Sequence, residues 1–141
     1  MKELQKVCLS IAGLDPSGGA GILADVRAFA AFGCFPAAAV TSLTYQNTQG
    51  VFGSENQSGE VVERQIMPLL DDYSLGAVKT GMLPSAEVIE AVARVLGTIP
   101  DVPLVVDPVV RSTSGFDLID DAALRSLTRR LFPMAAVVTP N

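Results

Sequence analysis

Residues 7–32 read VCLSIAGLDPSGGAGILADVRAFAAF, and the order of patterns within them sets the fold class. The stretch opens with a short apolar run closed by Gly13, which is typical of a buried strand. Ile22, Val26 and Phe29 then recur at helical spacing. A buried strand that leads through a glycine-rich turn into a helix is the first half of a βαβ unit. The stretch therefore predicts a parallel sheet.

Strand and helix patterns alternate through the rest of the chain. Further strands are expected at residues 37–46, 51–57, 77–79, 104–110 and 135–139, and helices at 58–73, 85–97 and from 120 to about 131. Pro68 should kink or interrupt the first of these helices, because it lacks an N–H and crowds the preceding turn. Alternating elements imply crossover connections with helices on both faces of the sheet. We therefore predict one α/β domain over residues 1–141, a three-layer sandwich with a mostly parallel central sheet.

Composition and charge narrow the classes of partner. The net charge is −5 and no Lys/Arg cluster is present, which argues against a nucleic-acid surface. No apolar run approaches the ~20 residues of a membrane-spanning helix. Cys8 and Cys34 lack metal-ligand spacing and are expected to be free thiols in a reducing compartment. We expect a cytoplasmic protein with a small-molecule partner, and an exposed sheet edge after Thr139 would favour a homo-oligomer.

The chemically informative residues follow the predicted strands. Gly13, Gln46, Lys79, Asp107 and Asn141 each stand at or just beyond the end of a different strand. Ligands of open parallel sheets bind outside the carboxyl ends of the strands. Five strands that deliver such residues to one edge indicate a cleft there.

Each candidate residue can be interpreted as functional or as purely structural. The Gln46 amide suits a heterocycle that presents a donor and an acceptor, or it fixes the following turn. Asp107 can hold Mg²⁺ or hydrogen-bond the next turn. Lys79 can neutralise phosphate or pair with a nearby acid, and Met82 can line a flat ring or simply fill the core. Asp25 borders the apolar stripe of its helix, so it needs a partner or a ligand unless its carboxylate reaches water.

The glycine-rich segment at residues 13–25, GLDPSGGAGILAD, leads into a helix whose first N–H groups can meet polar or anionic atoms. Its spacing fits neither the dinucleotide-binding G-x-G-x-x-G nor a Walker A loop. A dinucleotide-binding domain is therefore the least favoured of the functions considered, and a glycine-rich turn without a ligand stays open on this segment alone.

Several blocks, in order and at similar spacing, resemble the hydroxymethylpyrimidine/phosphomethylpyrimidine kinases of thiamine biosynthesis. The blocks are GLDPSGGAGI through Asp25, QNTQG at 46–50, VKTGML at 78–83, DPV at 107–109, SG at 114–115 and TPN at 139–141. The resemblance covers nearly the whole chain. It implies a ribokinase-like fold and a kinase that uses Mg²⁺ and ATP as co-substrate to phosphorylate 4-amino-5-hydroxymethyl-2-methylpyrimidine and then its monophosphate.

Carried over residue by residue, the resemblance implies two groups of site residues. One group surrounds the pyrimidine, with Gln46 on the ring edge: Gly13, Asp25, Gln46, Met82 and Val109. The other lies toward the nucleotide and phosphates: Lys79, Asp107 and Asn141, with Asp107 on the metal. No catalytic residue is assigned among the 141 positions.

The family's glycine-rich anion hole, catalytic residue and most of its ATP pocket follow the TPN block. The isolated chain, as a partial ribokinase-like domain, is therefore expected to show no meaningful phosphorylation. Two alternatives remain, a catalytically silent pyrimidine-binding or assembly module and a pyridoxine-type vitamin kinase.

Overall fold

The computed structural model describes residues 5–112 and 114–140, and within them six strands form one sheet. The strands are β1 (Val7–Leu14), β2 (Phe35–Asn47), β3 (Gly50–Asn56), β4 (Leu75–Thr80), β5 (Leu104–Val106) and β6 (Val137–Val138). The helices are α1 (Gly21–Ala31), α2 (Gly59–Asp72), α3 (Ala86–Leu96) and α4 (Asp121–Ser126), and α4 continues through a π-helical turn (Leu127–Leu131) and a 3₁₀ turn (Phe132–Met134). The predicted alternation of strands and helices is confirmed.

The sheet has the order β3-β2-β1-β4-β5-β6, and only β3 is antiparallel to its neighbour. The chain moves outward from β1 to β2 and β3, then returns to the other side of β1 with β4 and continues outward to β6. The direction of winding thus reverses between β1 and β4. In an open α/β sheet, a crevice forms at the carboxyl ends of the strands where the winding reverses.

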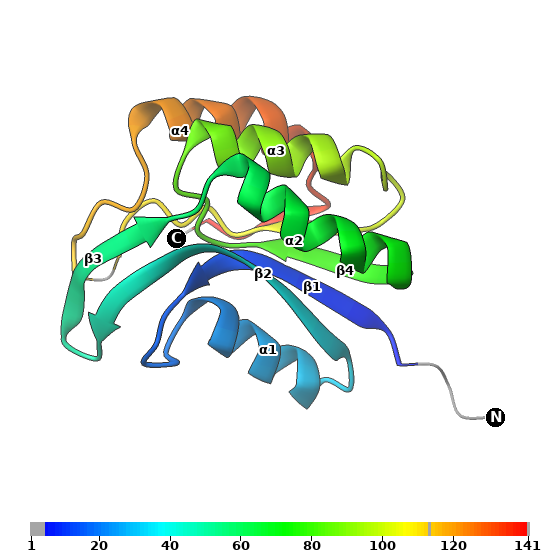
Figure 1. Ribbon diagram of the computed structural model, residues 1–141, viewed down its shortest axis with the longest axis horizontal. Coiled ribbons are helices and arrows are strands. Elements are labelled where there is room, and N and C mark those ends of the chain that lie inside the picture. The colour runs from blue at the N-terminus through cyan, green and yellow to red at the C-terminus, as the bar shows by residue number, and fades with distance from the viewer. Residues whose placement is uncertain (1–4, 113, 141) are drawn as a thin grey trace.

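Helices cover both faces of the sheet, as expected for three layers (Figure 1). Helix α1 packs on one face against β1 and β2, while α2, α3 and α4 lie together on the other. The main core fills the space between the sheet and these three helices. Its fully buried side chains include Leu9, Ile11, Val62, Ile66, Val88, Ile89, Val92, Val106 and Leu131.

Serine and aspartate side chains begin three of the helices. The side chains of Ser58, Ser85 and Asp120 each accept a hydrogen bond from a backbone N–H of the first turn. Pro68, expected to kink or interrupt its helix, lies inside α2, which continues without interruption to Asp72. Two buried residues of the preceding turns, Val62 and Ile66, attach α2 to the core and offset the lost hydrogen bond.

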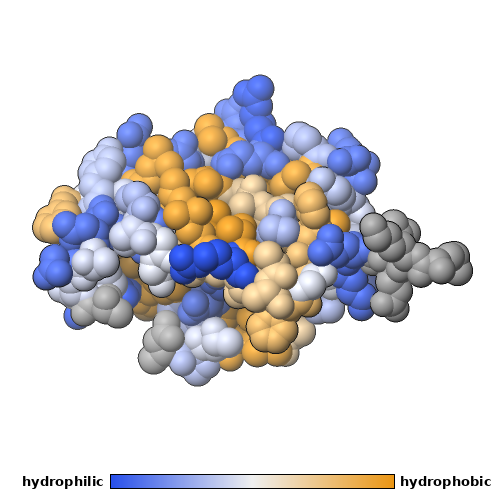
Figure 2. All heavy atoms as spheres, turned by 90° about the horizontal axis from the view of Figure 1, so that it is seen from below, coloured by the Kyte–Doolittle hydropathy of each residue, from blue (hydrophilic) through white to orange (hydrophobic). Residues whose placement is uncertain are grey.

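The face that carries α1 has hydrophobic atoms near its middle, with hydrophilic atoms around them (Figure 2). Of the α1 residues only Ile22 is buried, so the stripe predicted to include Val26 and Phe29 is partly exposed. Phe32 and Phe35, which follow α1, are exposed as well. In the described part of the chain, no helix has the length and apolar character needed to cross a membrane.

Candidate functional site

The turn after β1 is built around one carboxylate. Asp15 is 6% exposed, and its Oδ1 accepts hydrogen bonds from the backbone N–H (2.7 Å) and the hydroxyl (2.6 Å) of Ser17. Its Oδ2 accepts from the backbone N–H groups of Gly19 and Ala20, each at 3.0 Å. Burial by itself raises the pKa of Asp15. Hydrogen bonds from Ser17, the Gln46 side chain and the backbone outweigh that effect and hold the pKa below its usual value.

The same turn needs a glycine where α1 begins. Gly21 has φ of +60°, and a Cβ there would lie 2.3 Å from the carbonyl oxygen of Gly13. Gly21 also forms a bridge with Leu14, so the start of α1 lies directly beside the end of β1. This close approach brings the first turn of the helix to the carboxyl edge of the sheet.

A charged cluster lies next to this turn, on the α1 side of β4. The Lys79 ammonium hydrogen-bonds both carboxylate oxygens of Asp25 at 2.9 Å. The Ser10 hydroxyl, fully buried in β1, donates to Asp25 Oδ2 at 2.6 Å. Lys79 Nζ also lies 3.8 Å from Asp107 Oδ2. The side chains of Asp25, Lys79 and Asp107 are between 15% and 28% exposed, so this ion-pair group is largely shielded from water.

Residues after β4 and β5 complete the edge. Met82 is 6% exposed, and its carbonyl oxygen accepts a 2.6 Å hydrogen bond from the buried Thr41 hydroxyl. Gly81 lies so close to β1 that a Cβ would be 2.9 Å from the Cβ of Ala12 and 3.3 Å from Lys79 Nζ. The backbone N–H of Val109 donates to the carbonyl oxygen of Asp107 at 2.9 Å, which folds the chain back after β5.

Together these segments enclose a small pocket of about 130 Å³ at the carboxyl ends of β1, β2, β4 and β5. Its lining consists of Gly13, Asp15, Ala20, Gly21, Thr44, Gln46, Lys79, Gly81, Met82, Asp107 and Val109. A second, more polar hollow of about 460 Å³ shares Asp15, Ala20, Gln46 and Val109 with the pocket and extends toward Asn47–Val51 and Ser114. The expected cleft at this edge is therefore present.

The structure brings together six of the eight residues selected from the sequence. Gly13, Gln46, Lys79, Met82, Asp107 and Val109 line the pocket. Asp25 does not line the pocket, but it contacts Lys79, which does line it. Asn141 lies outside the described residues. Among residues 5–112 and 114–140, no three His, Cys, Asp or Glu side chains gather closely enough to hold a metal ion by themselves.

Sequence reasoning overlooked Ser10 and Thr44 as members of this edge. Both lie inside strands rather than after them, and each supports the site through one hydrogen bond. Thr44 Oγ1 donates to the Leu14 carbonyl oxygen at 2.7 Å, which ties β2 to the end of β1. The available signal was a hydroxyl side chain within an otherwise apolar strand, since a buried polar group needs a partner.

Comparison with known proteins shows the family of this chain. The family described as phosphomethylpyrimidine kinase matches residues 15–141. The chain belongs to the phosphomethylpyrimidine kinase family. The hydroxymethylpyrimidine/phosphomethylpyrimidine kinase of Mycobacterium leprae is 48% identical over 134 residues, which are 94% of this chain and 48% of that protein. The chain thus spans about half the length of this relative.

Solved structures of the phosphomethylpyrimidine kinase family and of a related vitamin kinase share the fold. The crystal structure of phosphomethylpyrimidine kinase from Clostridium difficile superposes with a TM-score of 0.89 at 40% identity, covering 97% of this chain and 59% of that one. The pyridoxal kinase of Staphylococcus aureus, solved with pyridoxal, gives 0.86 at 29% identity, covering 98% and 49%. The predicted ribokinase-like α/β sandwich is therefore confirmed.

Proposed function

We propose that this chain forms the pyrimidine-binding part of an ATP-dependent kinase of thiamine biosynthesis. Its substrates are 4-amino-5-hydroxymethyl-2-methylpyrimidine and the corresponding monophosphate. The observation that carries the proposal is the small pocket at the carboxyl edge, where four residues expected around the ring, Gly13, Gln46, Met82 and Val109, share one lining. Pockets for drug-sized ligands measure about 300–1,000 Å³, so a pocket of about 130 Å³ suits a single small ring.

The lining supplies the two kinds of contact that a flat heterocycle needs. Met82 and Gly13 form an apolar wall, and a Cβ at Gly13 would lie 2.9 Å from the Met82 sulfur. A polarizable thioether packs well against an aromatic face. The Gln46 amide offers a donor and an acceptor, so it can pair with a ring edge that carries both. We assign Gln46 to the ring edge and Met82 to the ring face.

The charged end of the pocket suits the phosphoryl side of the reaction. The Lys79 ammonium, which is held by Asp25, would neutralise the phosphate of the monophosphate substrate and act as a phosphate-binding residue in this proposal. Mg²⁺ is commonly held by one or two carboxylates together with phosphate oxygens and water. Asp107, on the pocket wall, fits the role of such a carboxylate, and Asn141 belongs to the same region by its motif. The metal would supply charge neutralisation at the phosphates of ATP.

Asp25 has two possible roles at this site. Its motif assigns it to the pyrimidine, and its hydrogen bonds to Ser10 and Lys79 support a role in holding the lysine at the charged end of the pocket. A double-mutant cycle separates them. If Asp25 acts through Lys79, Asp25→Asn should weaken binding of the monophosphate substrate in the wild-type background but have little further effect in Lys79→Met.

Calorimetry with 4-amino-5-hydroxymethyl-2-methylpyrimidine tests the main proposal. Gln46→Leu leaves the ring edge without its partner, which costs about 1–3 kcal/mol and raises Kd about 5- to 150-fold. Gln57→Leu is the matched control, because it makes the same chemical change at a residue that lies outside the pocket lining. Equal Kd values for wild type and Gln46→Leu would remove Gln46 from the site.

The same titration with pyridoxal tests the alternative vitamin. The solved pyridoxal kinase shares 29% identity with this chain, against 40% for the phosphomethylpyrimidine kinase structure, so we expect the pyrimidine to bind more tightly. Tighter binding of pyridoxal would assign the site to that ring instead. A wild-type chain that binds neither compound would overturn the proposed function.

A further inference from the structure

The pairing of β1 with β4 places Ser10 directly beside Lys79. The two residues are partners in the parallel register of these strands. Both side chains also contact Asp25, which lies on α1, so both point to the face of the sheet that α1 covers. Three segments far apart in the sequence therefore meet in one series of hydrogen bonds, which runs from Ser10 through Asp25 to Lys79.

This series has a buried end and a ligand end. Ser10 is fully buried, and its hydroxyl donates to Asp25 Oδ2 at 2.6 Å. The Lys79 ammonium donates to both Asp25 oxygens at 2.9 Å, is partly exposed and lines the small pocket. Asp25 lies between the two and does not line the pocket. A contact that fixes the Asp25 carboxylate therefore also fixes the Lys79 ammonium.

Ser10 is the more rigid of these two partners of Asp25. A hydroxyl that is buried away from water loses its hydrogen bond without replacement if it turns aside, so its orientation is strongly held. Lysine instead carries three donors on a flexible stem and can share them between a carboxylate and a phosphate. When Lys79 contacts a phosphate, the hydrogen bond from Ser10 keeps the carboxylate in place.

Helix α1 has few other contacts that could hold Asp25. Of the α1 residues only Ile22 is buried, so apolar packing fixes the helix mainly at its first turn. The hydrogen bond from Ser10 attaches the next turn to the sheet. Without it, the Asp25 side chain could turn and draw the Lys79 ammonium away from the pocket. The attraction between an ammonium and a phosphate falls as their distance grows.

We propose that Ser10 is a positioning residue for phosphate binding, which fixes the Asp25 carboxylate and through it holds the Lys79 ammonium at the charged end of the pocket. The inference rests on the proposed function, because that function assigns Lys79 to the phosphate of the monophosphate substrate. Ser10 does not line the pocket and acts only through Asp25 and Lys79. Its loss should therefore affect the phosphorylated ligand and spare the unphosphorylated one.

Calorimetry with two ligands tests this selectivity. The ligands are 4-amino-5-hydroxymethyl-2-methylpyrimidine and its monophosphate. Ser10→Ala should raise Kd for the monophosphate about three- to tenfold, as expected for the loss of one hydrogen bond, and leave Kd for the unphosphorylated compound within about twofold. Ser42→Ala is the matched control and should change neither Kd. Ser42 is also fully buried, donates to Asn56 Oδ1 at 2.8 Å and lies outside the pocket lining.

Two further variants distinguish positioning from a general structural role. In the Lys79→Met background, Ser10→Ala should change Kd for the monophosphate by less than about twofold, because the group that it positions is gone. Ser10→Thr keeps the hydroxyl and should retain the wild-type ratio of the two Kd values. If Ser10→Ala does not fold, Ser10→Cys serves in its place, because a thiol of similar size is a much weaker donor.

Three results would overturn the inference while the proposed function stands. They are an unchanged Kd for the monophosphate in folded Ser10→Ala, an equal loss of affinity for both ligands, and the same loss in the Lys79→Met background as in wild type. A wild-type chain that binds neither ligand would instead overturn the proposed function, and the role of Ser10 would fail with it.

Discussion

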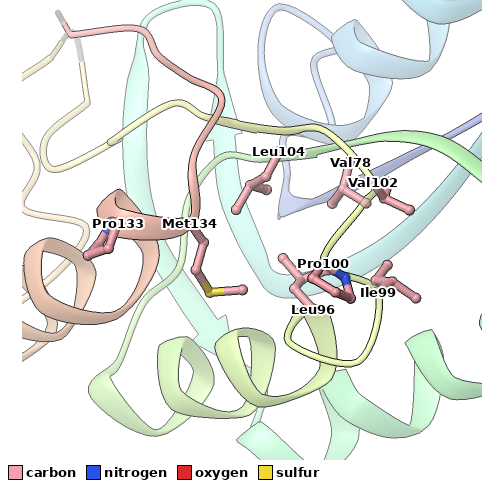
Figure 3. A pocket seen from close by; sticks show the side chains of 8 residues that line it. All are labelled: Val78, Leu96, Ile99, Pro100, Val102, Leu104, Pro133 and Met134. Atoms are coloured by element: carbon pink, nitrogen blue, oxygen red, sulfur yellow. The ribbon is translucent and has the colours of Figure 1, made fainter.

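A cavity at the amino edge of the sheet is larger than the small pocket at the carboxyl edge, but it is less informative about ligands. At the amino ends of β4 and β5 lies a cavity of about 280 Å³ between the end of α3 and the segment before β6 (Figure 3). The side chains that line it are all apolar: Val78, Leu96, Ile99, Pro100, Val102, Leu104, Pro133 and Met134. The pocket at the carboxyl edge is less than half that volume but is lined by two carboxylates, an ammonium and an amide.

The proposed binding site is thus distinguished from the apolar cavity by its converging polar groups and not by its volume. Side chains around the apolar cavity can exclude water but cannot orient a ligand. At the carboxyl edge, four parallel strands end close together, and each strand or the segment just after it contributes at least one residue to the pocket lining. At the opposite edge β1, β4 and β5 begin with buried core residues, namely Val7, Leu75 and Leu104. Substitutions at the two edges should therefore differ in size and in kind.

The largest difference in the free energy of unfolding is expected between substitutions at two glycines that both have positive φ. Gly21 lies at the carboxyl edge, and Gly33, with φ of +80°, precedes β2 at the amino edge. Gly21→Ala should lower the free energy of unfolding by about 4 kcal/mol, because the new Cβ adds a collision with a backbone carbonyl to the cost of the left-handed conformation. Gly33→Ala should cost only about 1 kcal/mol, since nothing lies within 4 Å of the new Cβ.

Urea unfolding of both variants measures these values. Equal losses of unfolding free energy in the two variants would show that the contact between α1 and the end of β1 is looser than the structure indicates.

A medium effect is expected when the shielded ion pair of the carboxyl edge loses one partner. Asp25→Asn leaves the Lys79 ammonium with weaker compensation and should lower the free energy of unfolding by about 2 kcal/mol, which is less than for a fully buried pair because both side chains are partly hydrated. Glu60→Gln is the control, since Glu60 and Arg64 form an exposed pair on α2 at 3.7 Å and should contribute at most about 0.5 kcal/mol. A loss at Asp25 no greater than at Glu60 would mean that water screens the site pair as well.

The smallest changes in the free energy of unfolding are expected at two buried threonines that flank the site, and the two changes should have opposite signs. The Thr80 hydroxyl has no hydrogen-bond partner among the described residues, whereas Thr41 donates to Met82. Thr80→Val should raise the free energy of unfolding by about 1 kcal/mol, because it removes an unsatisfied polar group and keeps the shape of the side chain. Thr41→Val should lower it by about 1 kcal/mol. A loss in stability for Thr80→Val would show that its hydroxyl does find a partner.

The sequence predicted the site better where residues follow strands than where they lie inside them. Gly13, Gln46 and Asp107 could be selected because hydrophobic runs end just before them, and parallel strands bring their ends to one edge. Ser10 and Thr44 could not, since their partners depend on which strands are neighbours. The Asp25–Lys79 pair spans 54 residues and forms only because β4 returns to the side of β1.

Element boundaries were less predictable than the elements themselves. The last strand, expected over residues 135–139, is limited to Val137–Val138, because β6 pairs with β5 over only two positions. The apolar residues of α1 share one face of the helix, as their spacing predicted. How deeply they are buried depends on how much of that face other segments cover. Periodicity indicates which side chains share a face and does not say how completely that face is packed.

The place of β1 in the sheet also constrains how the protein folds during synthesis. The first strand lies between β2 and β4, so one of its two hydrogen-bonded neighbours ends only at Thr80. A ribosome adds roughly 5–20 residues per second, and β1 therefore emerges several seconds before its second neighbour exists. During that interval one edge of β1 has no neighbouring strand. Pairing between distant segments is slow in any case, so this edge is where a nascent chain would benefit most from a chaperone.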